Sequence, residues 1–232
     1  MRPRIDAIRA PNSSSPALRT APHTTSSRAM PMRIDVWSDY VCPFCYLQEP
    51  VVERIQREFA GQVQVRWRSY ELRPDPEPTL DPAGEYLREI WGSAVYPMAA
   101  KRSMKLQLPP VQPRSRKAFE ATEYARDRSK ADAMRHAIFA AFFEEGRDIG
   151  DLQVLGGIAE SLDIHPSGLV RALEANVYTG RVVGDENEAA ELGLSGVPAM
   201  VLTPADDSGE RRLLISGAQP YETVRQIVER AL

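Results

Sequence analysis

The sequence predicts an α/β fold in which a small sheet-forming domain is interrupted by an all-helical insertion. Three observations support this prediction. Short segments of alternating polar and apolar residues, typical of strands, occur near both ends of the ordered chain. Between the first two strands, apolar residues recur three or four positions apart, as they do in a helix packed on a sheet. The long middle of the chain has helical periodicity and no strand signal.

The first ordered segment is predicted to be strand, helix, strand. Residues 33–38 alternate in polarity, residues 47–59 have the helical spacing, and residues 63–69 alternate again. Gly61 follows the helix as a stop signal. The tetrad Cys42-Pro43-Phe44-Cys45 therefore lies at the start of the helix, directly after the first strand.

The second half of the fold follows a helical block. A proline-rich run at 74–78 ends the first segment, and the pattern is then helical to about residue 176. Strand character returns at 199–202 and 212–215, and residues 220–232 form a closing helix. Without the helical block the order is β-α-β and β-β-α, which is the order of a thioredoxin fold.

The predicted organisation has three parts. Residues 1–31 are rich in Ser, Thr, Pro, Ala and Arg and form a disordered extension, because they carry too little apolar surface to offset the entropy of ordering. Residues 32–74 and 181–232 form the thioredoxin-like domain, and residues 75–180 form the helical insertion domain. The extension lacks the apolar core of a secretory signal. We interpret it as residues upstream of the true translation start, with an Arg/Ser-rich transit peptide as the alternative.

Composition and charge limit the cellular locations and the binding partners that we expect for this protein. No apolar run reaches the ~20 residues of a membrane span, and a net charge of -3 argues against nucleic acid or an anionic membrane as the main partner. Two cysteines in 232 residues exclude a disulfide scaffold. We expect a cytoplasmic protein, with the oligomeric state left open and a homodimer included.

The two cysteines are suited to exchanging electrons. A disulfide between such near neighbours constrains little of the unfolded chain, so it would stabilise little. At a helix N-terminus the partial positive charge favours a thiolate. We expect Cys42 to be the exposed nucleophile, and Cys45, one turn further on, to be more buried and to resolve the mixed disulfide. Neither Pro43 nor Phe44 adds a charge, so a weaker oxidant is expected than with histidine between the cysteines.

Two further features belong to the candidate site. Asp39 precedes Cys42 by three residues; it either accepts a proton from Cys45 through water or bonds to backbone N–H groups of its loop, and the sequence favours neither. Val197-Pro198 precedes a strand, and an X-Pro bond is the one type for which cis costs little. A cis bond there would place the Val197 backbone beside the cysteines, where it could pair with an extended substrate.

These residues resemble a known family. The segments 38–46 (SDYVCPFCY), 196–200 (GVPAM) and 215–219 (ISGAQ) are similar to the DsbA-type thioredoxin-like oxidoreductases, and within them to the FrnE-like subgroup. The resemblance covers roughly 32–232. It implies a DsbA-like fold whose helical block covers the site, and a dithiol–disulfide oxidoreductase or isomerase acting on protein thiols and disulfides or on small thiols. The implied catalytic residues are Cys42, Cys45 and Pro198.

The residues expected to line the substrate site are neighbours of these three: Asp39, Pro43, Phe44, Tyr46 and Val197. No cofactor is expected beyond the Cys42–Cys45 disulfide itself, with glutathione as a candidate ligand.

Three alternatives remain at this point. The sister group of glutathione-dependent kappa-class transferases and 2-hydroxychromene-2-carboxylate isomerases uses one activated Ser or Cys, which leaves Cys45 without a role. A zinc site would need His136 and His165 to join the two cysteines, and no metal is expected because there is no second CxxC. A scaffold that only binds a partner has no support in the sequence.

Overall fold

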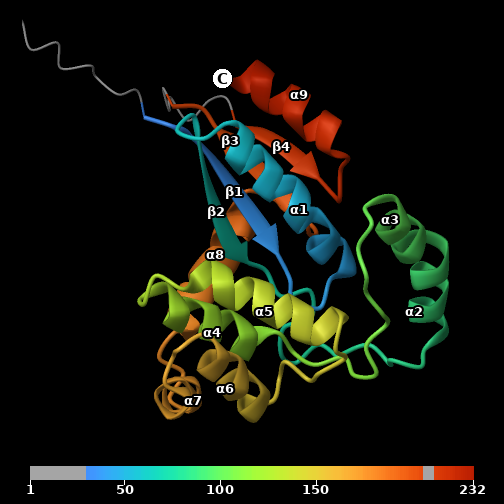
Figure 1. Ribbon diagram of the computed structural model, residues 1–232, viewed down its shortest axis with the longest axis vertical. Coiled ribbons are helices and arrows are strands. Elements are labelled where there is room, and N and C mark those ends of the chain that lie inside the picture. Colours follow the sequence, from blue (N-terminus) through green and yellow to red (C-terminus); the bar gives the residue numbers. More distant parts are fainter. Residues whose placement is uncertain (1–29, 206–211) are drawn as a thin grey trace, which may run out of the picture.

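The structure is a computed structural model that describes residues 30–205 and 212–232 (Figure 1). The predicted extension 1–31 therefore lies almost entirely outside the described residues. The helices and strands run in the following order: β1 (Met32–Ser38), α1 (Pro43–Glu58), β2 (Val63–Ser69), α2 (Glu85–Ile90), η1 (Trp91–Val95), α3 (Tyr96–Lys101), α4 (Arg116–Arg126), α5 (Ala131–Phe143), α6 (Leu152–Ser161), α7 (Pro166–Glu174), α8 (Thr179–Glu191), β3 (Ala199–Thr203), β4 (Leu213–Ser216) and α9 (Tyr221–Ala231).

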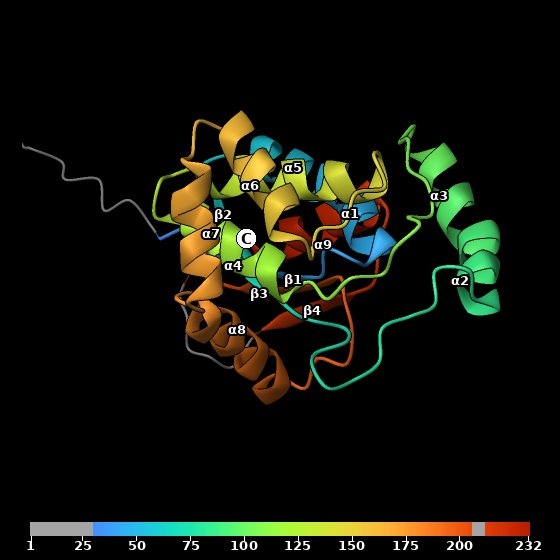
Figure 2. The ribbon, with the colours of Figure 1, turned by 90° about the horizontal axis from the view of Figure 1, so that it is seen from below.

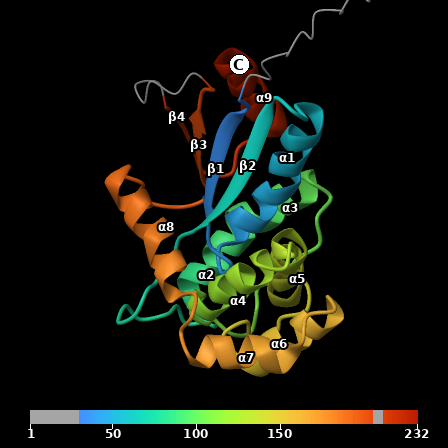
Figure 3. The ribbon, with the colours of Figure 1, turned by 90° about the vertical axis from the view of Figure 1, so that its left-hand side faces the viewer.

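The sheet has four strands in the order β2-β1-β3-β4. β1 is parallel to β2 and antiparallel to β3, and β3 is antiparallel to β4. α1 and α9 cover one face, and α8 covers the other (Figure 3). The predicted thioredoxin-like order of strands and helices with a helical insertion is confirmed.

The alternation along the central strands divides the core between these two faces. Val36 and Met200 pack with α1 and α9, whereas their neighbours Trp37 and Val201 pack on the α8 side. All four side chains are at most 5% exposed. Both faces of β1 and β3 are therefore covered, and this holds the loop after β1, which carries the cysteines, on a rigid support.

Most of the inserted helices form a second, aromatic-rich core below the sheet. α4, α5, α6 and α7 pack against one another at the carboxyl end of β1 (Figures 1 and 2). Phe139, Phe142 and Phe143 of α5 are fully buried there. α8 begins at Thr179 and leads from this core to the sheet, so the predicted boundary at 180/181 falls inside a helix.

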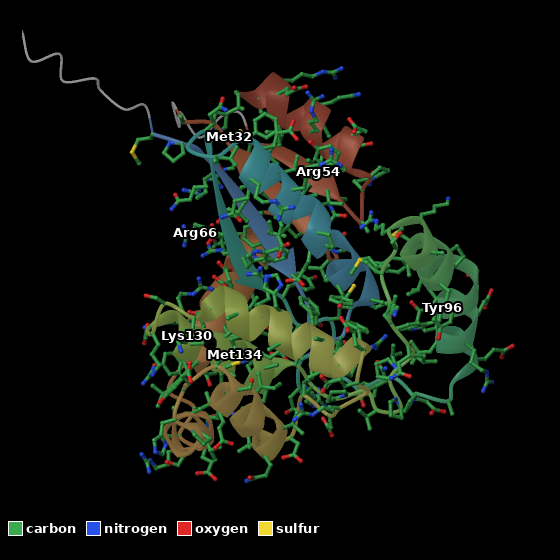
Figure 4. The ribbon with its side chains drawn as sticks, in the orientation of Figure 1. Met32, Arg54, Arg66, Tyr96, Lys130 and Met134 are labelled. Atoms are coloured by element: carbon green, nitrogen blue, oxygen red, sulfur yellow. The ribbon has the colours of Figure 1, made fainter. Side chains whose placement is uncertain are left out.

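The remaining insertion helices form an arm, which we define as residues 85–101. α2, η1 and α3 follow one another without a break, with a π-helical turn in the middle, and stand to one side of the body in Figures 1 and 4, where Tyr96 of the arm is labelled. The Trp91 ring lies 6.0 Å from that of Phe143. The adjoining Arg102 donates to the carbonyl oxygen of Gln219 at 2.9 Å and to that of Leu47. These contacts attach the arm to α5, and the residue that follows it to α1 and to the segment before α9.

A buried ion pair joins α1 to the helical block. Arg135 Nε donates to Glu49 Oε1 at 2.6 Å, and both side chains are at most 6% exposed. The Arg135 guanidinium also lies 4.3 Å from the centre of the Trp67 ring.

Across residues 30–205 and 212–232, none of the helices has both the length and the apolar character needed to cross a bilayer.

Candidate active site

Cys42 is the N-cap of α1. Its φ and ψ of -93° and 112° are extended, its N–H donates to the Asp39 carbonyl at 3.1 Å, and its own carbonyl accepts from Cys45 N at 3.1 Å. Pro43 follows at the first helical position, where a missing N–H removes no helical bond. The tight turn after β1 therefore places Cys42 at the positive end of the helix, the position that the sequence predicted for it.

Both cysteines are free thiols, and both are enclosed. Cys45 is 0% exposed and Cys42 only 4% exposed. The order of burial agrees with the prediction, but the expectation of an exposed Cys42 is wrong. The reason is that the first turn of α1 enters the core of the helical block, where both cysteines join its buried apolar cluster.

Burial raises the pKa of the Cys45 thiol well above its usual range, and the adjacent Cys42 thiol raises it further. The Asp39 N–H, which donates to Cys45 Sγ at 3.4 Å, acts in the opposite direction. Cys45 is therefore protonated at neutral pH in the reduced protein. It must lose this proton before it can attack another sulfur.

The Val197–Pro198 peptide bond is cis, the geometry that the sequence analysis considered for this X-Pro bond. Cys42 Sγ lies 3.7 Å from the Val197 carbonyl oxygen. On the other side, the Pro198 carbonyl accepts from Gly217 N at 2.8 Å, which ties this loop to the end of β4. Gly217 has a φ of 73°, which explains a glycine there. The structure thus brings together two motifs that are 155 residues apart.

A cavity of about 250 Å³ opens beside Cys42. Its floor is the start of α1 with the Val197 loop, and its walls come from the segment after β2, from the arm and from residues 112–113. The lining residues are Val41, Cys42, Pro43, Phe44, Leu72, Arg73, Thr79, Leu80, Tyr86, Leu87, Ile90, Trp91, Gln112, Pro113, Gly196 and Val197. Of the expected substrate-site residues, Pro43, Phe44 and Val197 line this cavity.

Asp39 lies behind the cysteines and is fully buried. Its carboxylate accepts from Leu72 N at 2.7 Å and from Val41 N at 3.2 Å. Burial raises the pKa of this carboxyl to about 6, and the hydrogen bonds from Leu72, Ser115 and Val41 oppose that rise. Of the two predicted roles, the bonds to backbone N–H groups are observed. The carboxyl does not line the cavity, so it does not contact a substrate there.

Tyr46, which was expected in the substrate site, packs elsewhere. Its ring stacks on Phe139 and Phe143 with centroids 5.4 Å away in each case, and its hydroxyl donates to Glu144. It is absent from the cavity lining. One position after Cys45 on a helix, the side chain is rotated away from the sulfurs, so Tyr46 fixes α1 against α5 instead.

Most of the cavity wall was missed from the sequence. Leu72 and Leu80 lie on either side of the proline-rich run at 74–78, at positions to which the sequence assigned no role, and Tyr86 and Ile90 come from a helix without motifs. Trp91 is both buried and part of the wall. A signal was available in Leu87, Ile90 and Trp91, whose helical spacing indicates one apolar face, but the pattern does not say what that face covers.

Metal ligands are not assembled in the described part of the chain, where no group of three or more His, Cys, Asp or Glu side chains is arranged to hold an ion. His136 Nε2 lies 2.9 Å from Glu53, and His165 Nδ1 lies 3.1 Å from Ser167 Oγ. Both histidines thus have neighbours other than the cysteines.

Comparison with known proteins agrees with this geometry. The model of the DSBA-like thioredoxin domain matches residues 33–229. The chain belongs to the DSBA-like thioredoxin family. A curated relative of this DSBA-like chain, the uncharacterized protein YwbO of Bacillus subtilis, is 34% identical over 152 residues, which is 64% of this chain and 75% of that protein.

Solved structures of similar fold include two proteins named as a DsbA oxidoreductase and a disulfide reductase, and one named as an isomerase. A probable DsbA oxidoreductase from Streptomyces coelicolor is 26% identical with a TM-score of 0.72, and the match covers 86% of this chain and 89% of the other. The cytosolic disulfide reductase DsbM from Pseudomonas aeruginosa, solved with GSH, is 19% identical with a TM-score of 0.63 over 85% and 99% of the two chains. A 2-hydroxychromene-2-carboxylate isomerase is 19% identical with a TM-score of 0.68 over 85% and 95%. At these lower identities the likeness is one of fold.

Proposed function

We propose that this protein exchanges thiols and disulfides through Cys42 and Cys45. The observation that carries the proposal is the arrangement of the two sulfurs. Cys42 lies at a helix N-terminus and lines a cavity, whereas Cys45 is enclosed behind it. One sulfur can meet a substrate and the other can meet only its partner, which is the division of labour that a two-step exchange requires.

In the first step the Cys42 thiolate attacks one sulfur of a substrate disulfide RSSR. A mixed disulfide Cys42–S–S–R forms, the substrate S–S bond breaks, and one thiolate RS⁻ leaves and takes a proton from water. In the second step Cys45 loses its proton and attacks Cys42 Sγ. The Cys42–Cys45 disulfide forms, the second RS⁻ leaves, and two electrons have passed from the protein to RSSR. The reverse sequence oxidises a dithiol.

The second step needs a proton acceptor for Cys45, because burial holds that thiol in its protonated form. Asp39 is the acidic residue whose backbone contacts Cys45: its N–H bonds to Cys45 Sγ, and its carboxyl, with a pKa of about 6, is largely ionised at neutral pH. We therefore keep proton transfer to Asp39, through water, as part of the proposal.

The finer assignments belong to the same proposal. They are a place in the FrnE-like subgroup, isomerase as well as oxidoreductase activity on protein or small thiols, and a cytoplasmic location. The tetrad with its Gly-Val-Pro partner supports the first, and the fold shared with a P. aeruginosa protein named a cytosolic disulfide reductase supports the last.

Glutathione-dependent transfer or isomerisation is the competing function. The cavity beside Cys42 would admit a small thiol, and an isomerase is among the structures of similar fold. That chemistry uses a single activated residue, and it leaves unexplained why a second thiol is packed against the first. Calorimetric titration of glutathione into Cys45→Ala, followed by a transferase assay, separates the two, because only the competing function keeps full turnover without Cys45.

Replacing Cys45 by serine is expected to trap the mixed disulfide. The hydroxyl is too weak a nucleophile to release the substrate from Cys42, so the adduct should persist for hours where the wild-type adduct is resolved. Intact-mass measurement after mixing with 4,4′-dithiodipyridine reads this directly. The proposal predicts one adduct per chain, on Cys42; an unmodified variant, or an adduct that resolves at the wild-type rate, would contradict it.

A further inference from the structure

We propose that the natural substrate of this site is a low-molecular-weight disulfide or thiol with an apolar body and an anionic group. The apolar body would fill the cavity beside Cys42, and the anion would pair with Arg73. This inference rests on the proposed exchange function and specifies its substrate class.

The access to Cys42 argues for a small substrate. Only 4% of the Cys42 surface is exposed, and the sulfur is reached through a cavity of about 250 Å³ between α1 and the arm. A disulfide in a folded protein is attached at both sulfurs to backbone that would have to enter this space. A small molecule meets no such obstacle, since pockets of a few hundred Å³ suit ligands of that size.

The walls argue for an apolar body. The cavity is lined by a set of apolar side chains: Leu72, Leu80, Leu87, Ile90, Trp91, Phe44 and Val197. An apolar group placed there leaves water, and burial of its apolar surface favours binding. A strongly polar body would lose its water with few groups to replace it, because the neutral polar side chains in the described lining, apart from Cys42, are Thr79, Gln112 and Tyr86 with its hydroxyl.

One residue gives the cavity a charge. Arg73 is the only charged residue among the described residues that line it. Its carbonyl accepts from Arg114 at 3.0 Å, which fixes the backbone, but its guanidinium makes no hydrogen bond or ion pair within residues 30–205 and 212–232. By contrast, Arg68, Arg116 and Arg135 each have a carboxylate partner. A half-buried arginine whose guanidinium has no partner in the described residues, and which lines the same cavity as Cys42, is suited to a carboxylate on the substrate.

The test compares single-turnover reactions of the reduced full-length protein with disulfides of different charge. Four probes are used: 4,4′-dithiodibenzoate is aromatic and anionic, 4,4′-dithiodipyridine is aromatic and neutral, 3,3′-dithiodipropionate is aliphatic and anionic, and cystamine is aliphatic and cationic. Each rate constant is divided by the rate constant of the same probe with dithiothreitol, which removes the differences in intrinsic reactivity between the probes. Oxidation of Cys42 and Cys45 supplies both electrons, so a single turnover needs no further reductant.

The proposal predicts the highest normalised rate for 4,4′-dithiodibenzoate and the lowest for cystamine. Arg73→Gln should slow the two anionic probes about tenfold and change 4,4′-dithiodipyridine less than twofold, and Arg73→Lys should restore most of the loss. Arg88→Gln is the matched control, because Arg88 is an exposed arginine on α2 outside the cavity lining. It should behave like the wild type.

Equal loss for anionic and neutral probes in Arg73→Gln would overturn the charge assignment. Reduction of insulin, a folded protein disulfide, as fast as 4,4′-dithiodibenzoate would overturn the small-substrate assignment. In both cases the exchange function itself would stand, since every probe would still react through Cys42. If no probe reacts with the wild type, the proposed function fails instead, and this inference fails with it.

Discussion

Cys42→Ser is expected to lower the rate of disulfide exchange by at least about a thousandfold. A thiolate attacks a disulfide sulfur readily, whereas a serine hydroxyl is not ionised near neutral pH and is a weak nucleophile. Cys45 cannot take over, because it is 0% exposed and does not line the cavity. The measurement is the single-turnover release of thiopyridone from 4,4′-dithiodipyridine.

The matched control is Cys45→Ser, which removes the other sulfur by the same chemical change. It should retain the first release of thiopyridone and lose only the second. The pair of variants thus assigns the two steps to the two sulfurs. If Cys42→Ser kept a tenth or more of the wild-type rate, or if Cys45→Ser lost the first release as well, the assignment of the nucleophile would be wrong.

Asp39→Asn is expected to change how the free energy of unfolding depends on pH. The folded protein raises the pKa of Asp39 from the usual 3.8 to about 6, which corresponds to about 3 kcal/mol. The pKa of Asp39 is higher in the folded protein than in the unfolded chain. The stability that its neutral carboxyl contributes is therefore fully present below about pH 4 and is lost as the pH rises through 6. Asparagine does not ionise, so the variant loses nothing over this range.

Urea unfolding at pH 4.5 and pH 7.5 measures this effect. Between these two pH values the free energy of unfolding of the variant, taken relative to that of the wild type, should rise by about 2 kcal/mol. The fixed cost of a lost hydrogen bond to Val41 or Leu72 is the same at both pH values and cancels in this difference. Asp148→Asn is the control, since its exposed carboxylate likewise accepts a backbone N–H, that of Gly150 at 2.8 Å. Parallel pH curves for the wild type and Asp39→Asn would contradict the proposed burial of an ionisable carboxyl.

Local sequence patterns were enough to predict the fold because its elements have strong local signals. Alternation at 33–38 and 63–69 reports strands whose neighbouring residues meet different environments, and the spacing from Leu47 to Phe59 reports a helix with one face on the sheet. The helix start at Cys42 followed from the same boundary. Pairing this start with Val197-Pro198 used the resemblance as well as the residues.

Burial and the cavity could not be predicted in this way, because they depend on contacts between distant segments. Cys42 looked exposed as a helix N-cap, and only the packing of the helical block around the tetrad encloses it. Tyr46 looked close to the site from its position in the chain, but its ring lies among Phe139 and Phe143. Arg73 carried no signal at all, since its importance comes from the cavity that its neighbours form.

The most direct test of the central proposal is the redox equilibrium of the two sulfurs. The full-length protein is equilibrated in buffers with an increasing ratio of oxidised to reduced dithiothreitol. Free thiols are then alkylated with iodoacetamide, and the number of labels is read by intact-mass spectrometry. With two cysteines in the chain, the proposal predicts that both labels disappear together in one two-electron transition of about 30 mV per tenfold change, with Cys42 and Cys45 joined. Thiols that remain labelled under fully oxidising conditions, or that are lost one at a time to separate adducts, would contradict it.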